Sequence, residues 1–494
     1  MTSRRHHRGA GRPEGAHRVP DYGRARGEYR GVSVELAPAA AVDRGLGADL
    51  VAAGGAALLV AVAAVAGARL LDDGVPLHVE APPLGAQWLP HTGPGTVPAV
   101  LIALLVVLRG PELAARLPWR RLLGLSAATS LAWTISLALI DGWQRGVVDR
   151  LTTPTEYLHD VPRVSDVGAM LRSFAEHIQG PQPGSWTTHV AGHPPGALLV
   201  FVGLDRLGLP GGAPAALLCM LIGSSAGVAV AVTLRALGEP AIARAVLPFG
   251  VLWPGAIWVG VSADGLFAGV LAWAVALLAI GASRSRLDRS AVAASAAGGL
   301  LLGATLYLSY GLALAGVLPV AIAVAARRFV PLLVVGTAVA AVVAAFAAAG
   351  FWWLDGYHQV MIRYYQPSEY GLVRPYGYWV WADLACLAVV LGPAGVAGLR
   401  RAFAPGRMAA VEDAPNRGWW SLKSPQLVCA AAGIAVLVAD LSGLSKAEVE
   451  RIWLPFAVWL IAGTGLIPVR QARWWLAAQA VLALGVNHLL LTTW

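Results

Sequence analysis

Acidic residues gather in one long polar stretch of an otherwise apolar chain, residues 142–193. Glu156 and Asp160 stand four residues apart in "EYLHD", so on a helical turn they would share a face. Asp141 precedes them at the end of an apolar run. A carboxylate at a membrane surface can act as a general base, its pKa tuned by partial burial; helix capping or loop solvation is the alternative role for each acid. We take Glu156 as the first candidate for a base, followed by Asp160 and Asp141.

Two histidines follow in "TTHVAGHPPGALLVF", residues 187–201. His189 and His193 are four residues apart, a spacing that could bind a metal ion on a helix. The glycine and the prolines beside His193 disfavour a helix there, so we expect both histidines to have structural or substrate-contacting roles and predict no metal site. The Pro-Pro pair suits the first turn of a helix. Because residues 194–208 are too short for a comfortable span, we expect an interfacial or re-entrant helix on the outer side.

Further polar residues stand beside later apolar runs. Asp264 in "SADGLF" lies between two such runs, where capping of the next helix is the alternative to a substrate role. The aromatic segment 351–379 contains Arg374 and Tyr376. Aromatic platforms with charged neighbours suit sugar or polyprenyl-phosphate head groups, and arginine is a good bidentate partner for phosphate. We therefore select Arg374 as a phosphate ligand and Tyr376 for substrate positioning.

The stretch "GLSKAEVERIW", residues 443–453, places charges directly before an apolar run. Lys446 and Arg451 fall on the expected outer side, where the positive-inside preference disfavours basic residues. A phosphate ligand is our preferred reason for keeping them there. An internal salt bridge with Glu448 or Glu450 is the alternative, and Glu450 is kept among the substrate-binding candidates.

Membrane helices must position these residues. Of the 494 residues, 57% are hydrophobic and only 13% are charged, a balance far from that of soluble proteins. A helix needs about 20 apolar residues to cross a bilayer core of about 30 Å. Runs near that length predict an all-α polytopic protein with about thirteen spans, at 46–71, 96–110, 121–141, 213–234, 240–259, 261–281, 290–309, 311–326, 329–350, 378–398, 426–442, 452–468 and 474–492.

Arginine and lysine clusters between the runs set the expected orientation. Thirteen crossings with the N-terminus in the cytoplasm and the C-terminus outside place these clusters on the cytoplasmic side of the plasma membrane. The net charge of +9 is therefore interpreted as topology, and we expect the lipid bilayer and no nucleic acid as a partner. Residues 1–45, rich in Arg, Gly and Pro, are expected to form a disordered basic cytoplasmic tail.

The order of these features resembles the GT-C superfamily of membrane glycosyltransferases, which use polyprenyl-phosphate sugars. A span, a long outer loop with "TEYLHD", then "GHPPG" and "SADGLF" are similar to the layout of the protein mannosyltransferase and aminoarabinose transferase branches. The resemblance implies that Glu156, or Asp160, deprotonates an acceptor hydroxyl while a sugar is transferred with inversion. The chain departs from the pattern in lacking an adjacent Asp-Glu pair, in having Gly196 after Pro-Pro, and in having extra N-terminal spans.

These observations predict four segments. They are the tail 1–45, two additional spans in 46–120, a GT-C-like catalytic core in 121–350 with the outer loop 142–208, and the outer loop and last spans in 351–494.

The predicted enzyme moves a hexose or pentose from a polyprenyl-phosphate donor to an envelope glycan or lipid acceptor. No cofactor is predicted, and a divalent cation is left open. The alternative is a transporter or flippase of a lipid-linked sugar or another amphiphile, which would show internal repeats and polar residues near the midplane.

Overall fold

Long apolar helices dominate the computed structural model, which describes residues 45–180, 182–366, 373–404 and 423–492. Within these ranges nine helices are long and apolar enough to cross a membrane. They are α1 (Leu46–Asp72), α2 (Thr96–Arg116), α3 (Trp119–Ala138) with η1 (Leu139–Asp141), α8 (Gly212–Ser224) continued by α9 (Ala226–Ala236), α12 (Ala263–Ala282), α13 (Arg289–Leu308), α15 (Val330–Ala348), α18 (Tyr376–Ala402) and α20 (Ser424–Leu441). The chain is a multi-pass membrane protein. The predicted tail lies outside the described residues, apart from residue 45.

The expected count of thirteen spans is not confirmed. Three predicted runs form shorter apolar helices: α10 (Pro240–Val251), η5 (Tyr310–Gly316) with α14 (Val317–Ala326), and α22 (Leu454–Leu460) with η7 (Ile461–Leu466). Proline and glycine shorten them; the Trp-Pro-Gly at 253–255, for example, follows the end of α10. The last run forms α23 (Val469–Leu489), which contains Arg470 and Arg473 in its first five residues and is too polar for the same class.

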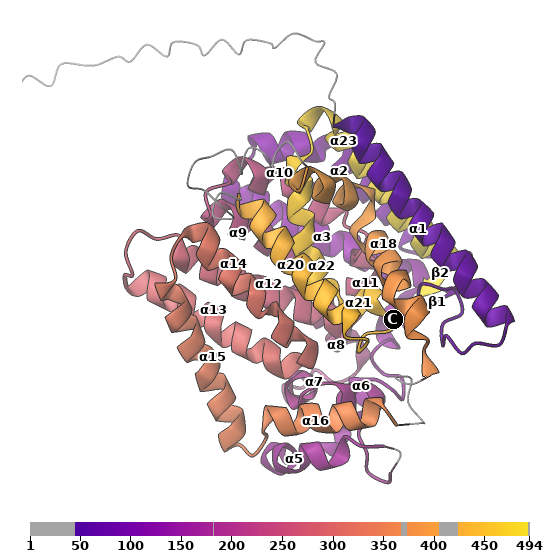
Figure 1. Ribbon diagram of the computed structural model, residues 1–494, viewed down its shortest axis with the longest axis vertical. Coiled ribbons are helices and arrows are strands. Elements are labelled where there is room, and N and C mark those ends of the chain that lie inside the picture. Colours follow the sequence, from indigo (N-terminus) through magenta and orange to yellow (C-terminus); the bar gives the residue numbers. More distant parts are fainter. Residues whose placement is uncertain (1–44, 181, 367–372, 405–422, 493–494) are drawn as a thin grey trace, which may run out of the picture. The chain divides into compact units, whose positions relative to one another are not determined.

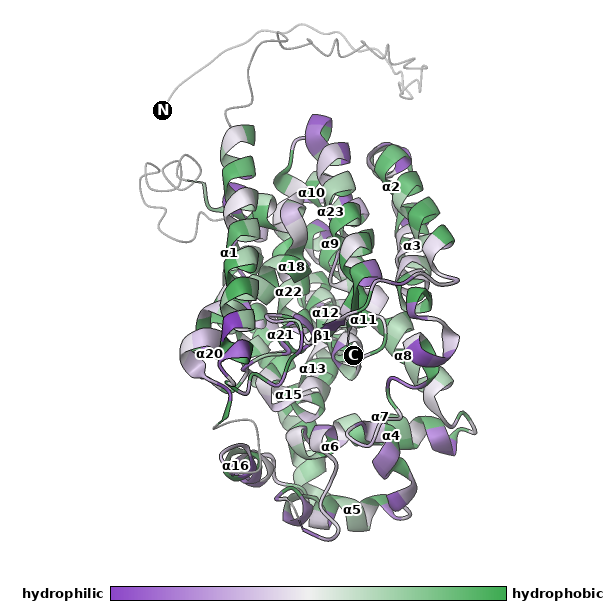
Figure 2. Cartoon of the chain, turned by 90° about the vertical axis from the view of Figure 1, so that its right-hand side faces the viewer, coloured by the Kyte–Doolittle hydropathy of each residue, from purple (hydrophilic) through white to green (hydrophobic). Residues whose placement is uncertain are grey.

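Among the nine long helices, α12 is the most buried, and it packs against α8, α9, α13 and α22. Of its apolar window, 78% is buried, compared with 11% for α1 and 17% for α15, so α12 is central and the other two are peripheral. Helix α1 lies along α18 (Figure 1), where Asp49 near the start of α1 pairs with Arg400 and Arg401 at the end of α18. Figure 2 shows hydrophobic residues along the bundle helices and hydrophilic residues mainly in loops and at helix ends.

Two three-residue strands are the exception to the all-α prediction. Strand β1 (Ala86–Trp88) follows α1, and β2 (Leu490–Thr492) follows α23 directly. They pair antiparallel, with Gln87 opposite Leu491. The run predicted to span to residue 492 therefore ends as a helix at Leu489.

The 142–208 loop forms seven short helices, and those labelled in the figures, α4 to α7, lie with α16 at one end of the bundle (Figures 1 and 2). The seven are η2 (Gln144–Val148), α4 (Tyr157–Asp160), η3 (Val161–Arg163), α5 (Val167–Ser173), η4 (Phe174–His177), α6 (Thr188–Gly192) and α7 (Pro195–Arg206); α16 (Trp353–Tyr364) comes from the segment after α15. The loop is thus folded, and it delivers polar side chains to the end of the apolar bundle.

Helix α7 explains the Pro-Pro-Gly that the sequence places there. Pro194 is its N-cap and Pro195 its first residue, as predicted. With 12 residues, α7 is about 18 Å long, which is too short to cross a bilayer core of about 30 Å. A Cβ on Gly196 would lie 2.5 Å from the backbone oxygen of Tyr307, so the absence of a side chain lets α7 pack directly against the end of α13.

Candidate functional site

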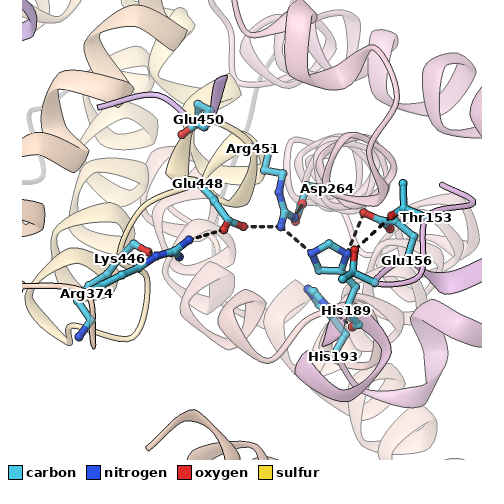
Figure 3. A network of polar contacts seen from close by, with 12 residues as sticks. Thr153, Glu156, His189, His193, Asp264, Arg374, Lys446, Glu448, Glu450 and Arg451 are labelled. Atoms are coloured by element: carbon cyan, nitrogen blue, oxygen red, sulfur yellow. Dashed lines mark hydrogen bonds and ion pairs between the residues drawn. The ribbon is translucent and has the colours of Figure 1, made fainter. Parts of the chain in front are cut away.

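A continuous network of charged contacts joins the 142–208 loop to segment 443–453 (Figure 3). The short helix α21 (Val449–Ile452) contributes Arg451, and α12 contributes Asp264. Five of the residues selected from the sequence are linked in this way through their side chains: Glu156, His189, Asp264, Arg374 and Arg451.

Glu156 stands at the start of α4, where its backbone is extended rather than helical. Its Oε1 lies 2.8 Å from Nδ1 of His189, and both side chains are 11% exposed. Nε2 of His189 lies 3.0 Å from Nη2 of Arg451. Because a guanidinium can only donate, Nε2 must accept, and the proton of a neutral His189 is then on Nδ1, toward Glu156. The imidazole thus connects a carboxylate to a guanidinium.

Arg451 is the centre of the network. Its Nη1 donates to Asp264 at 2.6 Å and its Nη2 donates to Glu448 at 2.8 Å. Burial lowers the pKa of Arg451, but Asp264 and Glu448 reverse this, and the net pKa is raised. The N-cap role considered for Asp264 is performed by Ser262, whose hydroxyl accepts from the backbone N–H of Gly265. Asp264 is left to balance the charge of Arg451.

Glu448 is the member of the network that the sequence analysis did not select as a site residue. Its Oε1 accepts from Arg374 at 2.8 Å while its Oε2 accepts from Arg451 at the same distance. Burial raises its pKa, but Arg451 and Arg374 outweigh burial and hold the pKa below the ordinary value. Ala447 and Glu448 have φ of 67° and 62°, a left-handed conformation that costs about 1–2 kcal/mol for each non-glycine residue. The alternative of an internal salt bridge is therefore found, with Glu448 rather than Glu450.

The outer edge of the network carries Lys446 and the aromatic residues. The ammonium of Lys446 lies 5.8 Å from the ring centroid of Tyr364, and burial, followed by Arg374, lowers its pKa. Arg374 also donates to the backbone oxygen of Lys446 at 2.8 Å. Tyr376 is 42% exposed and donates to the backbone oxygen of Leu441 at 3.2 Å. Lys446 and Arg374 thus stand together, whereas Tyr376 holds the start of α18 against the end of α20.

His193 contacts the backbone of His189. Its Nδ1 lies 2.7 Å from the backbone oxygen of His189 and 2.9 Å from the hydroxyl of Tyr157. Burial lowers its pKa, which favours the neutral ring. Within the described residues no group of three or more His, Cys, Asp or Glu side chains could hold a metal ion.

Three selected acids lie outside this network. Asp160 is fully buried and accepts from Arg163 at 2.6 Å and from both N–H and hydroxyl of Thr187, so it fastens the loop. It shares no helix face with Glu156, because α4 has only four residues and Glu156 precedes them. Asp141 pairs with His91 and Arg150 and so joins η1 to the β1 region.

Glu450 points away from Arg451 (Figure 3). Its Oε1 accepts from the backbone N–H of Gly85 at 2.7 Å, and burial raises its pKa to about 7. Gly85 lines a cavity of about 330 Å³ between the end of α1 and β1. Glu450 therefore connects α21 to the loop between α1 and α2.

Comparison with known proteins gives one distant structural similarity. The structure is similar to the crystal structure of ArnT from Cupriavidus metallidurans bound to undecaprenyl phosphate, with a TM-score of 0.39 and 16% sequence identity over 70% of this chain. The similarity spans 59% of the length of that chain. No family model and no curated protein matches the sequence. The proposals below rest on the side chains of this chain.

Proposed function

We propose that the protein is a membrane glycosyltransferase that moves a sugar from a polyprenyl-phosphate donor to an acceptor hydroxyl outside the cytoplasm. One observation carries the proposal. A carboxylate suited to proton abstraction, Glu156, is linked through His189, Arg451 and Glu448 to Arg374, which stands beside Lys446. A base and phosphate-binding cations thus occupy one network.

The chemistry assigns a role to each end of the network. Glu156 takes the proton of the acceptor hydroxyl as its oxygen attacks the anomeric carbon. The bond from that carbon to the phosphate oxygen breaks, and the electron pair leaves with the polyprenyl phosphate. Arg374, Lys446 and Arg451 stabilise the negative charge that develops on the leaving phosphate. Attack opposite the leaving group inverts the anomeric configuration.

The position of His189 serves this role for Glu156. Arg451 donates to one imidazole nitrogen, so the other nitrogen presents its proton toward the Glu156 carboxylate. This contact fixes the direction of the Glu156 carboxylate. His193, bonded to the backbone of His189, keeps the imidazole in place.

The test is sugar transfer by the purified full-length protein from a panel of radiolabelled polyprenyl-phosphate sugars, beside Glu156→Gln. Loss of a general base is expected to lower the transfer rate about 10²–10⁴-fold. Glu176→Gln neutralises an exposed acid of the same loop and should transfer like the wild type. Full activity in Glu156→Gln would refute its role as base. Movement of a lipid-linked sugar between the two leaflets of proteoliposomes, without sugar transfer, would instead support a transporter or flippase.

A further inference from the structure

The carboxylate of Glu448 occupies the position between two guanidiniums that a phosphate group would take. Its two oxygens each accept one N–H, from Arg374 and from Arg451, at 2.8 Å. Two charge-assisted contacts from separate arginines are the arrangement by which proteins hold phosphate oxygens. Figure 3 shows Glu448 between the two arginines, with Lys446 beside Arg374.

The backbone that holds Glu448 there is strained. Ala447 and Glu448 are consecutive non-glycine residues with left-handed φ. Ala447 is fully buried and its N–H donates to Asp383 at 3.2 Å. Movement of this turn to an ordinary conformation would release the strain and withdraw the carboxylate from the arginines.

Arg451 would keep its place without Glu448. It still donates to Asp264 and to Nε2 of His189, so its guanidinium is held by α12 and α6. Arg374 still donates to the backbone oxygen of Lys446. Both arginines are thus oriented by partners other than the carboxylate between them.

We propose that Glu448 is an internal occupant of the donor phosphate site and is displaced when a lipid phosphate binds between Arg374 and Arg451. This inference rests on the proposed function, because it assumes that these arginines bind the donor. Its consequence concerns turnover. The leaving lipid phosphate is a monoester with more negative charge than the donor diester, so it binds the arginines more tightly. Return of Glu448 competes with it and promotes its release.

The test measures binding of undecaprenyl phosphate to the full-length protein in nanodiscs at fixed pH and salt. Glu448→Gln removes the competing charge with little change in shape, and we expect at least tenfold tighter binding, which corresponds to about 1.4 kcal/mol. Ala447→Gly relieves strain in the occupied conformation and should weaken binding. Glu176→Gln, the exposed loop acid, is the control and should bind like the wild type.

Two outcomes would overturn the inference. One is equal or weaker binding by a folded Glu448→Gln variant, which would make Glu448 a structural partner of the arginines. The other, decisive if Glu448→Gln does not fold, is unchanged or tighter binding by Ala447→Gly. Binding of inorganic phosphate, measured in parallel, shows whether the lipid portion is required. These readouts are independent of sugar transfer, so a lack of transferase activity would contradict the proposed function alone.

Discussion

Replacement of Arg451 by methionine should test how strongly the central network holds the fold. Asp264 is 4% exposed, and within the described residues its ion pair is with Arg451 at 2.6 Å. Glu448 would keep its second partner, Arg374. The substitution therefore strands one buried carboxylate rather than two. Removal of one partner from a buried ion pair costs about 3–5 kcal/mol, and we expect a loss of this size in the free energy of unfolding.

The assay is equilibrium unfolding in detergent micelles titrated with SDS. Arg451→Met combined with Asp264→Asn should recover part of the loss, because the stranded charge is then absent. Arg116→Met is the matched control, since the 2.8 Å contact of Arg116 with Glu112 is exposed and such pairs contribute about 0–1 kcal/mol. A loss below 1 kcal/mol in Arg451→Met, or strict additivity in the double variant, would refute the argument.

Two further predictions concern Glu450 and the start of α7. Burial raises the pKa of Glu450 from 4.5 to about 7, so its contribution to stability is full below pH 4.5 and declines by about 3 kcal/mol as pH rises through 7. The unfolding free energy of Glu450→Gln relative to wild type should therefore rise by that amount between pH 4 and pH 8. A difference that does not change with pH would contradict the raised pKa. Gly196→Ala places a methyl group 2.5 Å from the Tyr307 backbone oxygen and should lower the free energy of unfolding by about 1–3 kcal/mol. As the control, Gly192→Ala places a methyl group with no atom within 4 Å and should leave the free energy of unfolding unchanged. Equal effects of the two substitutions would show that α7 does not pack as described.

Much of the helical arrangement could be predicted from the sequence, because a run of about 20 apolar residues has few stable alternatives to a membrane helix. Nine of the thirteen predicted runs coincide with long apolar helices of the described chain. The other four predicted runs do not form long apolar helices, because hydrophobic composition alone does not account for helix-breaking residues and flanking charges. The prolines and glycines near residues 253–255 end α10 early, and Arg470 and Arg473 make α23 too polar.

The candidate site was predicted in part. Glu156 and His189 could be selected because they are polar residues of the long loop 142–193, and Arg451 because it stands directly before an apolar run. The pairing of Asp264 with Arg451 could not, because 187 residues separate them. Glu448 stands three residues before Arg451, a spacing that suits an ion pair on one helical turn. Arg451 pairs with Glu448 rather than Glu450 because of the left-handed turn at residues 447 and 448. Amino-acid propensities do not predict such a turn for Ala-Glu.

The pairing of β1 with β2 fixes the parity of the membrane topology. Because α1 separates Gly45 from β1, a crossing by α1 puts these two on opposite faces of the membrane. β2 lies beside β1, so Thr492 is on the face of β1 and opposite Gly45. The chain between Gly45 and Thr492 must then cross an odd number of times. If all nine long apolar helices cross, the shorter helices α10, α14 with η5, and α22 with η7, together with α23, can add only an even number of crossings, whatever the orientation of the whole.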